Sequence, residues 1–175
     1  MNTILDKIGK LNALVIGDIM LDHYIWGDAT RISPEAPVPV VEISRDTYTA
    51  GGAANVAANM RAMGARAEVW GWIGKDSAGK LLRAILRRKD VAFPTDVFTT
   101  NVPTTQKTRV IVQHQQLCRL DREAEPSCYP RDISKRISGL LKTIRDHDVV
   151  IFSDYAKGFL DSTLIGTITA AARKA

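Results

Sequence analysis

Two adjacent glycines, Gly51 and Gly52, constrain the fold of this chain more than any other feature. They begin the run GGAANVAAN of residues 51–59, whose later part has the composition of a helix. Because glycine has no Cβ, a ligand or another segment can approach the backbone closely there. The first turn of a helix adds unpaired backbone N–H groups. The run therefore predicts either a polyol- or anion-binding site or a tight turn before an alanine-rich packing helix.

The side chains of this predicted helix have a regular spacing. Three apolar residues at helical intervals form an apolar stripe: Val56, Met60 and Met63. Asn55 and Asn59 are four residues apart and lie on one face of the helix. An amide side chain both donates and accepts hydrogen bonds, so Asn55 joins Gly51 and Gly52 as a candidate binding residue.

The rest of the chain alternates apolar runs with helical patterns. Three segments predict strands of a central sheet: 13–16, 67–74 and 149–152. Shorter pieces at 91–93 and 97–98 also resemble strands. Capping side chains precede the helical patterns: Asp76 or Ser77, Asp132, and Asp161. This order predicts an α/β fold with a largely parallel, doubly wound sheet and helices on both of its faces.

Residues 22–43 depart from this rhythm and predict a small β lid. Segments 22–28 and 37–43 read as two strands joined by a turn. Prolines cannot donate ladder hydrogen bonds, so the two in the second segment place it at an edge or on a protruding flap. We expect His23, in the first segment, to be a surface residue without a catalytic role.

A further strand is predicted at 104–112, followed by a strand piece at 117–121 after a polar turn. Strict alternation of side chains places Lys107, Arg109 and Ile111 on one face of the first strand.

Asp18 directly follows the first apolar strand. The carboxyl ends of parallel strands are the usual location of ligands in open α/β sheets, which makes Asp18 a candidate binding residue. A capping or turn role is the alternative, because Asp readily bonds to nearby backbone.

Composition argues against two classes of partner. The 175 residues carry a net charge of +5, and the cations are spread along the chain. The densest cluster, at 83–89, lies at a predicted helix end, where cations are favourable. This pattern does not predict nucleic-acid binding, whereas an anionic small substrate fits it. No apolar run approaches the ~20 residues of a membrane span, and residues 1–10 do not resemble a signal peptide, so we expect a soluble protein without a membrane partner.

Cys118 and Cys128 are isolated and show no CxxC spacing. They predict neither zinc nor any other metal site. Reduced, unpaired thiols are typical of the cytoplasm, where we expect this protein to be located.

Four short segments, taken in order, resemble the ribokinase (PfkB-type) family of carbohydrate kinases. They are Gly17-Asp18, the run 51–55, Gly64, and the Gly-Lys-Asp of residues 74–76. Three longer runs make the resemblance narrower and point to the heptose 7-phosphate kinases: GDIMLD at 17–22, RISPEAPVPVV at 31–41 and SDYAKG at 153–158. The resemblance extends from about residue 11 to residue 175 and implies a ribokinase-like, Rossmann-like fold.

The resemblance implies ATP-dependent phosphorylation of D-glycero-β-D-manno-heptose 7-phosphate at O1, giving the 1,7-bisphosphate in ADP-heptose and lipopolysaccharide biosynthesis. ATP and Mg²⁺ are the implied cofactors. Asp18 would accept hydrogen bonds from sugar hydroxyls, while Gly51, Gly52 and Asn55 would hold hydroxyls against the helix N-terminus. The lid would cover the sugar and form a homodimer contact.

The 7-phosphate needs nearby cations, and we expect Arg109 and Lys157 to provide them. Arg119 would replace Arg109 if the strand faces differ from those expected.

The chain departs from the family at the Gly-Ala-Gly-Asp motif, which carries the general base. Nothing in residues 1–175 matches that motif, so no catalytic residue is assigned. We expect the chain to be the N-terminal part of one kinase domain, without the C-terminal kinase half and the adenylyltransferase domain. A non-catalytic sugar-phosphate-binding or dimerisation module is the alternative, and a related kinase for another sugar is a third possibility.

Overall fold

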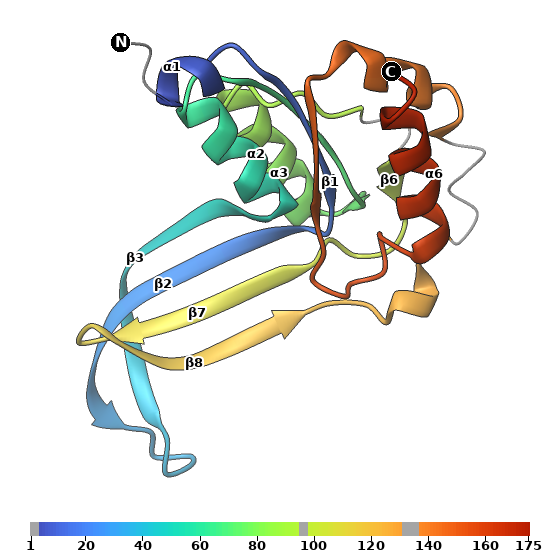
Figure 1. The fold of residues 1–175 in the computed structure, drawn as a ribbon. Helices are drawn as coiled ribbons and strands as arrows, with labels where there is room; N and C mark the ends of the chain where they lie inside the picture. Colours follow the sequence, from blue (N-terminus) through green and yellow to red (C-terminus); the bar gives the residue numbers. More distant parts are fainter. Residues whose placement is uncertain (1–3, 95–97, 131–136) are drawn as a thin grey trace.

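A three-stranded parallel sheet forms the centre of the computed structural model, which describes residues 4–94, 98–130 and 137–175 (Figure 1). Its strands are β1 (Asn12–Gly17), β4 (Arg66–Trp70) and β9 (Val149–Ser153). The strand order is β4-β1-β9, so the strand predicted at 13–16 is central and both of its neighbours run parallel to it. The predicted α/β layout is confirmed.

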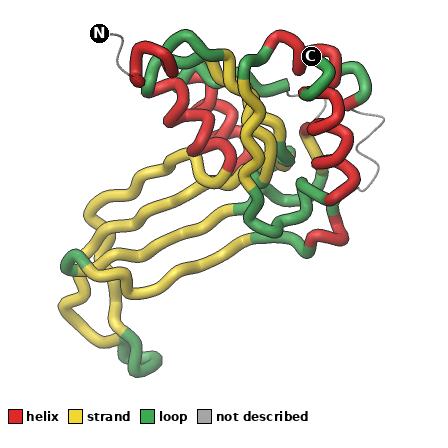
Figure 2. Tube along the Cα trace, viewed as in Figure 1, coloured by secondary structure: helices red, strands yellow, loops and turns green. Residues whose placement is uncertain are grey.

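Helices cover both faces of this sheet (Figure 2). The longest three are α2 (Ala53–Ala62), α3 (Ser77–Arg88) and α6 (Ser162–Ala172). Successive side chains of β1 point to opposite faces of the sheet and pack in two separate hydrophobic cores. Val15 packs in the core cluster that includes residues of α2 and α3, whereas Leu14 and Ile16 pack in the cluster that includes residues of α6.

Two predicted helix caps are confirmed. The Asp76 side chain accepts a hydrogen bond from the Gly79 backbone N–H at 2.8 Å, and Asp161 accepts one from the Leu164 N–H at 2.7 Å. Ser77, the alternative to Asp76, is the first residue of α3.

Shorter helices complete the described part of the chain. They are α1 (Ile4–Ile8) and the 3₁₀ helices η1 (Pro126–Cys128) and η2 (Leu140–Asp146). The expected cap Asp132 lies outside the described residues. The described residues resume at 137, and the last part of the helix expected after Asp132 is the 3₁₀ helix η2.

The predicted apolar stripe of α2 is only partly buried, with Val56 and Met60 packed against the core. The buried side chains are four alanines: Ala53, Ala54, Ala57 and Ala58. Val56 and Met60 are half-buried, and Met63 is 37% exposed. Alanine has the smallest side chain with a Cβ, so an alanine face lets the helix lie close to β1 and β4, which it contacts.

The strand predicted at 67–74 is in fact two strands. β4 ends at Trp70, and β5 (Ile73–Gly74) pairs with β6 (Thr99–Thr100) in a separate two-stranded sheet. β4 is therefore an edge strand of the three-stranded sheet, apart from a single bridge between Glu68 and Ala92.

The strand piece predicted at 91–93 forms only that bridge at Ala92. In the piece predicted at 97–98, Val97 lies outside the described residues, and Phe98 is buried in the second core.

The lid is a four-stranded sheet that projects away from the helices (Figure 1). Its strands are β2 (Ile19–Ile32), β3 (Pro39–Gly52), β7 (Gln106–Val112) and β8 (Gln115–Arg122). The order is β3-β2-β7-β8, so β3 is an edge strand, as its prolines predicted. The lid is larger than the predicted 22–43: its hairpin spans 19–52, and β2 also pairs in parallel with β7.

The two faces of the lid differ in chemistry. Cross-strand partners and alternation place one set of ionisable residues together, here called the charged face: Asp22, Lys107, Arg109, Arg119 and Asp121. The opposite side, here called the apolar face, carries Ile25, Val110 and Leu120. Leu120 is 59% exposed.

His23 lies at the base of the apolar face and is buried, which contradicts its expected surface position. Its ring stacks on Tyr48 with a centroid distance of 4.1 Å. Nε2 lies 3.2 Å from Asp46 Oδ2, and Nδ1 lies 3.3 Å from Thr108 Oγ1. His23 therefore joins three lid strands.

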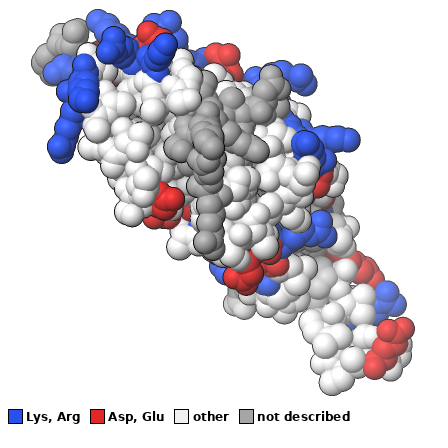
Figure 3. All heavy atoms as spheres, turned by 90° about the vertical axis from the view of Figure 1, so that its right-hand side faces the viewer, with Lys and Arg blue, Asp and Glu red and all other residues white. Residues whose placement is uncertain are grey.

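The side of the molecule drawn in Figure 3 carries charges of both signs. On the side drawn in Figure 3, Lys and Arg form several separate groups with Asp and Glu between them. Among the described residues, no helix combines the length and the apolar character that crossing a bilayer requires.

A histidine–carboxylate pair connects the segment before β9 to β4. His147 Nε2 lies 3.6 Å from Glu68 Oε2, and the Trp70 indole N–H donates to Glu68 Oε1 at 2.5 Å. The hydrogen bond to Glu68 raises the pKa of His147. Burial alone would raise the pKa of Glu68, but the hydrogen bonds from His147 and Trp70 outweigh it and lower that pKa.

This pair makes stability depend on pH. The stabilisation from His147 is fully present below its unfolded pKa of about 6.5 and is lost as the pH rises through the higher folded value. We therefore expect the urea midpoint of the parent chain to fall between about pH 6 and about pH 8, and His147→Gln to remove this part of the fall. An identical pH dependence in the parent and the variant would show that the pair does not stabilise the fold.

Candidate functional site

Asp18 lies at the carboxyl end of β1 and is 3% exposed. Its carboxylate accepts hydrogen bonds from three backbone N–H groups of the loop that follows β9: Tyr155 at 2.8 Å, Lys157 at 3.1 Å and Phe159 at 3.1 Å. This carboxylate therefore fixes the loop over the end of the central sheet. This loop-positioning role differs from the local cap or turn considered from the sequence, because the bonded amides lie 137 to 141 positions further along the chain.

The glycine pair lies directly against Asp18. The Asp18 carbonyl accepts a hydrogen bond from the Ala53 N–H at 2.9 Å, which joins the end of β1 to the start of α2. Gly52 has φ 57° and ψ −135°, and a Cβ there would lie 2.2 Å from the same carbonyl oxygen. The conformation and the close approach both require glycine.

Gly51 is enclosed on the charged face of the lid. A Cβ at this position would lie 2.4 Å from Asp22 Oδ2. The two glycines therefore hold α2, the end of β1 and the lid close together.

Asn55 is exposed in the first turn of α2. It lies three residues after Gly52, close to the helix N-terminus with its unpaired backbone N–H groups. The helix N-terminus, Asp18 and the glycine pair thus meet at the carboxyl end of the central sheet, with Asn55 exposed to solvent beside them.

Arg109, one expected phosphate ligand, is held by the lid itself. Its Nη1 lies 2.6 Å from Asp22 Oδ1, and its Cζ lies 5.2 Å from the Tyr24 ring centroid. The hydrogen bond to Asp22 raises the pKa of Arg109, so the guanidinium stays charged. Arg119, the expected substitute, is its direct cross-strand neighbour on β8.

Lys157, the other expected phosphate ligand, is paired with a carboxylate that the sequence reasoning missed. Its Nζ lies 3.0 Å from Glu123 Oε1 and 2.9 Å from Oε2. Glu123 Oε2 is also 3.7 Å from the Lys107 Nζ, which is 2.8 Å from Asp121 Oδ2. A continuous chain of ion pairs thus connects the loop after β9 to the charged face.

These contacts shift the carboxylates toward the ionised state. The Lys157 hydrogen bond holds the pKa of Glu123 below its ordinary value, and the Lys107 hydrogen bond does the same for Asp121. Both carboxylates therefore remain ionised at neutral pH.

Lys107, Asp22 and Glu123 were not proposed as site residues from the sequence. Alternation had placed Lys107 on the same face as Arg109, which was the available signal. The partners of Arg109 and Lys157 could not be inferred, because they depend on the parallel pairing of β2 with β7 and on the path of the loop after β9.

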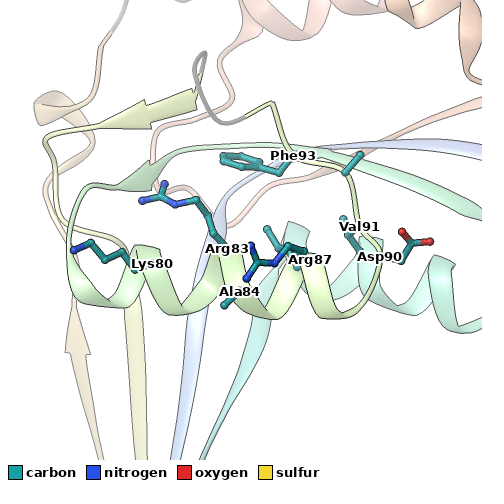
Figure 4. A pocket seen from close by; sticks show the side chains of 9 residues that line it. Lys80, Arg83, Ala84, Arg87, Asp90, Val91 and Phe93 are labelled. Atoms are coloured by element: carbon teal, nitrogen blue, oxygen red, sulfur yellow. The ribbon is translucent and has the colours of Figure 1, made fainter.

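A separate basic hollow of about 500 Å³ lies along α3 (Figure 4). Lys80, Arg83 and Arg87 line it. Arg83 donates hydrogen bonds to the Gly74 carbonyl at 3.1 Å and to Thr99 Oγ1 at 3.3 Å, so part of this charge has a structural role. The hollow is not at the carboxyl end of β1, where the glycine pair and Asp18 meet.

The described residues do not fit a Mg²⁺ site. Among them, no group of three or more His, Cys, Asp or Glu side chains could hold a metal ion. The carboxylates of the candidate site are already engaged by backbone N–H groups or by cations.

Residues 10–137 match the family model described as pfkB family carbohydrate kinase. The chain belongs to this family. The matched span includes β1, both lid hairpins, the glycine pair and α3, so most of the candidate site lies within the part of the chain that the family model covers.

Curated relatives agree with this assignment. The chain is 44% identical over 167 residues to the bifunctional protein HldE of Geobacter sulfurreducens. The aligned residues make up 95% of this chain and 34% of the relative. It is 42% identical over 157 residues to the D-beta-D-heptose 7-phosphate kinase of Bordetella bronchiseptica, covering 89% of this chain and 49% of the relative. The chain thus spans about a third to a half of the length of these relatives.

Solved structures show the same fold. A carbohydrate kinase from Agrobacterium tumefaciens superposes with a TM-score of 0.69 at 21% identity, over 93% of this chain and 51% of that chain. A ribokinase from Arabidopsis thaliana, solved with ribose and ATP, superposes with a TM-score of 0.59 at 17% identity. The superposition covers 94% of this chain and 51% of that chain. The predicted ribokinase-like fold is confirmed.

The requirement for glycine at position 52 can be tested with a matched pair of substitutions. Gly52→Ala is expected to lower the free energy of unfolding by about 3 kcal/mol, because a Cβ meets the Asp18 carbonyl in a conformation nearly restricted to glycine. Gly166→Ala, inside α6 with open space around the new Cβ, should raise it by about 0.5–1 kcal/mol. Chemical denaturation measures both, and a mild effect at position 52 would disprove the close packing.

Proposed function

We propose that this chain provides the sugar-binding part of a cytoplasmic kinase that phosphorylates D-glycero-β-D-manno-heptose 7-phosphate at O1 with ATP. The observation that carries the proposal is the joining of the glycine pair, Asp18 and the cationic lid at the carboxyl end of the central sheet. Family membership and the names of the relatives support the substrate class.

The sugar would bind over the N-terminus of α2. Asn55 is exposed in the first turn and would exchange hydrogen bonds with sugar hydroxyls, and Gly51 and Gly52 would let the sugar approach the backbone. Asp18 has three bonds to the loop after β9, so we propose that it positions that loop and offers its remaining acceptor capacity to a hydroxyl.

The 7-phosphate would bind between the lid and the loop after β9. Arg109 belongs to β7 of the lid, and Lys157 belongs to the loop after β9. A guanidinium and an ammonium group are both established phosphate ligands, the first for its fork geometry and the second as a point charge.

We propose that most of the ATP site, the Mg²⁺ ligands and the general base belong to residues outside these 175. The chain matches about a third of each bifunctional relative, and no Gly-Ala-Gly-Asp motif occurs in it. We therefore propose that it corresponds to the first part of one kinase domain, with the C-terminal half and an adenylyltransferase domain outside it.

A homodimer through the lid is part of the same proposal. The apolar face exposes Leu120 and Ile43, at 59% and 63%, on a sheet that projects from the body. Exposed apolar side chains on a protruding sheet are typical of a protein–protein contact.

Binding calorimetry with heptose 7-phosphate tests the sugar site. Asn55→Ala is expected to weaken binding at least about tenfold, equivalent to about 1.4 kcal/mol, because a paired amide is lost. Asn59→Ala is the matched control: it removes an exposed amide one turn later in the same helix and should leave the affinity unchanged. Equal effects of the two substitutions, or no binding to the parent chain, would contradict the proposed site.

Turnover distinguishes the kinase part from the alternative of a binding module. The 175-residue chain should bind heptose 7-phosphate without converting ATP to ADP. Adding the C-terminal part of a related kinase should restore turnover if the chain is a kinase part. Binding that persists without any restored turnover would favour the non-catalytic module.

A further inference from the structure

Glu123 connects the lid to the body through Lys157, one of the two proposed ligands of the 7-phosphate. It follows β8 directly, and its carboxylate lies between two ammonium groups that come from separate parts of the fold. Lys157 belongs to the loop fixed by Asp18, whereas Lys107 belongs to β7 of the lid. The single carboxylate is therefore the counterion shared between them.

The two lysines need an anion between them. Their side chains are 13% exposed for Lys107 and 26% exposed for Lys157. Partly buried cations are costly without a counterion. Asp121 neutralises Lys107 from the side, at 2.8 Å, but the acceptors that Lys157 reaches at 2.9 and 3.0 Å are both oxygens of Glu123.

The position of Glu123 also suits a phosphate group. A phosphate has three free oxygens and up to two negative charges, where the carboxylate has two oxygens and one charge. Lysine ammonium groups bind either anion as point charges. The Glu123 side chain is 34% exposed at the end of a strand, so it can turn into solvent when another anion replaces it.

We propose that, in the ligand-free chain, Glu123 occupies the place of the substrate's phosphate group between Lys107 and Lys157. The identity of the phosphorylated sugar rests on the proposed function, but the anion exchange does not. Binding then replaces a carboxylate bridge between lid and body with a phosphate bridge. Lys107 becomes a phosphate ligand beside Arg109, and Glu123 becomes an internal competitor that sets the affinity.

Removal of the competing charge is the direct test. Measured by calorimetry, Glu123→Gln is expected to bind both inorganic phosphate and heptose 7-phosphate more tightly than the parent chain. The expected gain in affinity is roughly fivefold, which corresponds to the contribution of one surface ion pair. Glu125→Gln is the matched control, since it removes an exposed carboxylate two residues away, and it should change neither affinity. Lys107→Met in the Glu123→Gln background should abolish the gain.

A purely structural ion pair gives a different result. It predicts that Glu123→Gln lowers the thermal midpoint and leaves phosphate affinity unchanged or weaker, which would overturn the inference. Glu123→Ala removes the carboxylate in a second way and should show the same gain as Glu123→Gln. Failure of both variants to bind inorganic phosphate more tightly than the parent would also contradict it.

The two proposals fail in different ways. If Glu123→Gln gains affinity for inorganic phosphate while heptose 7-phosphate binds no better than phosphate alone, the anion site stands and the sugar assignment is wrong. If heptose 7-phosphate binds in an Asn55-dependent way while Glu123→Gln gains nothing, the proposed function stands and the exchange at Glu123 is wrong.

Discussion

The structure depends on the hydrogen bonds of one buried residue, Asp18. Its carboxylate accepts three backbone N–H groups from the loop after β9, and its carbonyl accepts the first N–H of α2. Hydrogen bonds to an ionised, buried acceptor are stronger than those between neutral groups. One residue at the end of β1 therefore determines where α2 begins and where Lys157 is held.

The lid adds charge to this arrangement through its topology. Parallel pairing of β2 with β7 brings Asp22 beside Arg109, although they are 87 positions apart in the chain. Antiparallel pairing of β7 with β8 aligns Lys107 with Asp121 near the end of β8. The charged face therefore meets the loop that Asp18 fixes, while the apolar face points away from it.

Features determined by local sequence could be predicted. The apolar runs at β1 and β9, the caps Asp76 and Asp161, and the edge position of the proline-containing strand depend on a few neighbouring residues. The glycine pair was recognised as a close-approach site for the same reason, since φ 57° at Gly52 requires a residue without Cβ.

Features determined by packing could not be predicted in this way. Helical spacing indicates Val56 and Met60, which are half-buried against the core, whereas the fully buried side chains of α2 are its alanines. His23 gave no sign of burial, because its stacking on Tyr48 depends on the register of β2 with β3. The competition of Glu123 for Lys157 likewise depends on a contact between segments far apart in the sequence.

Amide hydrogen exchange tests most directly the claim that Asp18 organises the site. In Asp18→Asn, one of the two side-chain oxygens becomes an NH₂ group, which cannot accept a hydrogen bond. The amides of Tyr155, Lys157 and Phe159 should therefore exchange at least about tenfold faster than in the parent chain. Asp154→Asn, which affects an exposed carboxylate bonded to Ala156, should leave those three unchanged. Unchanged exchange in Asp18→Asn would contradict the organising role of Asp18.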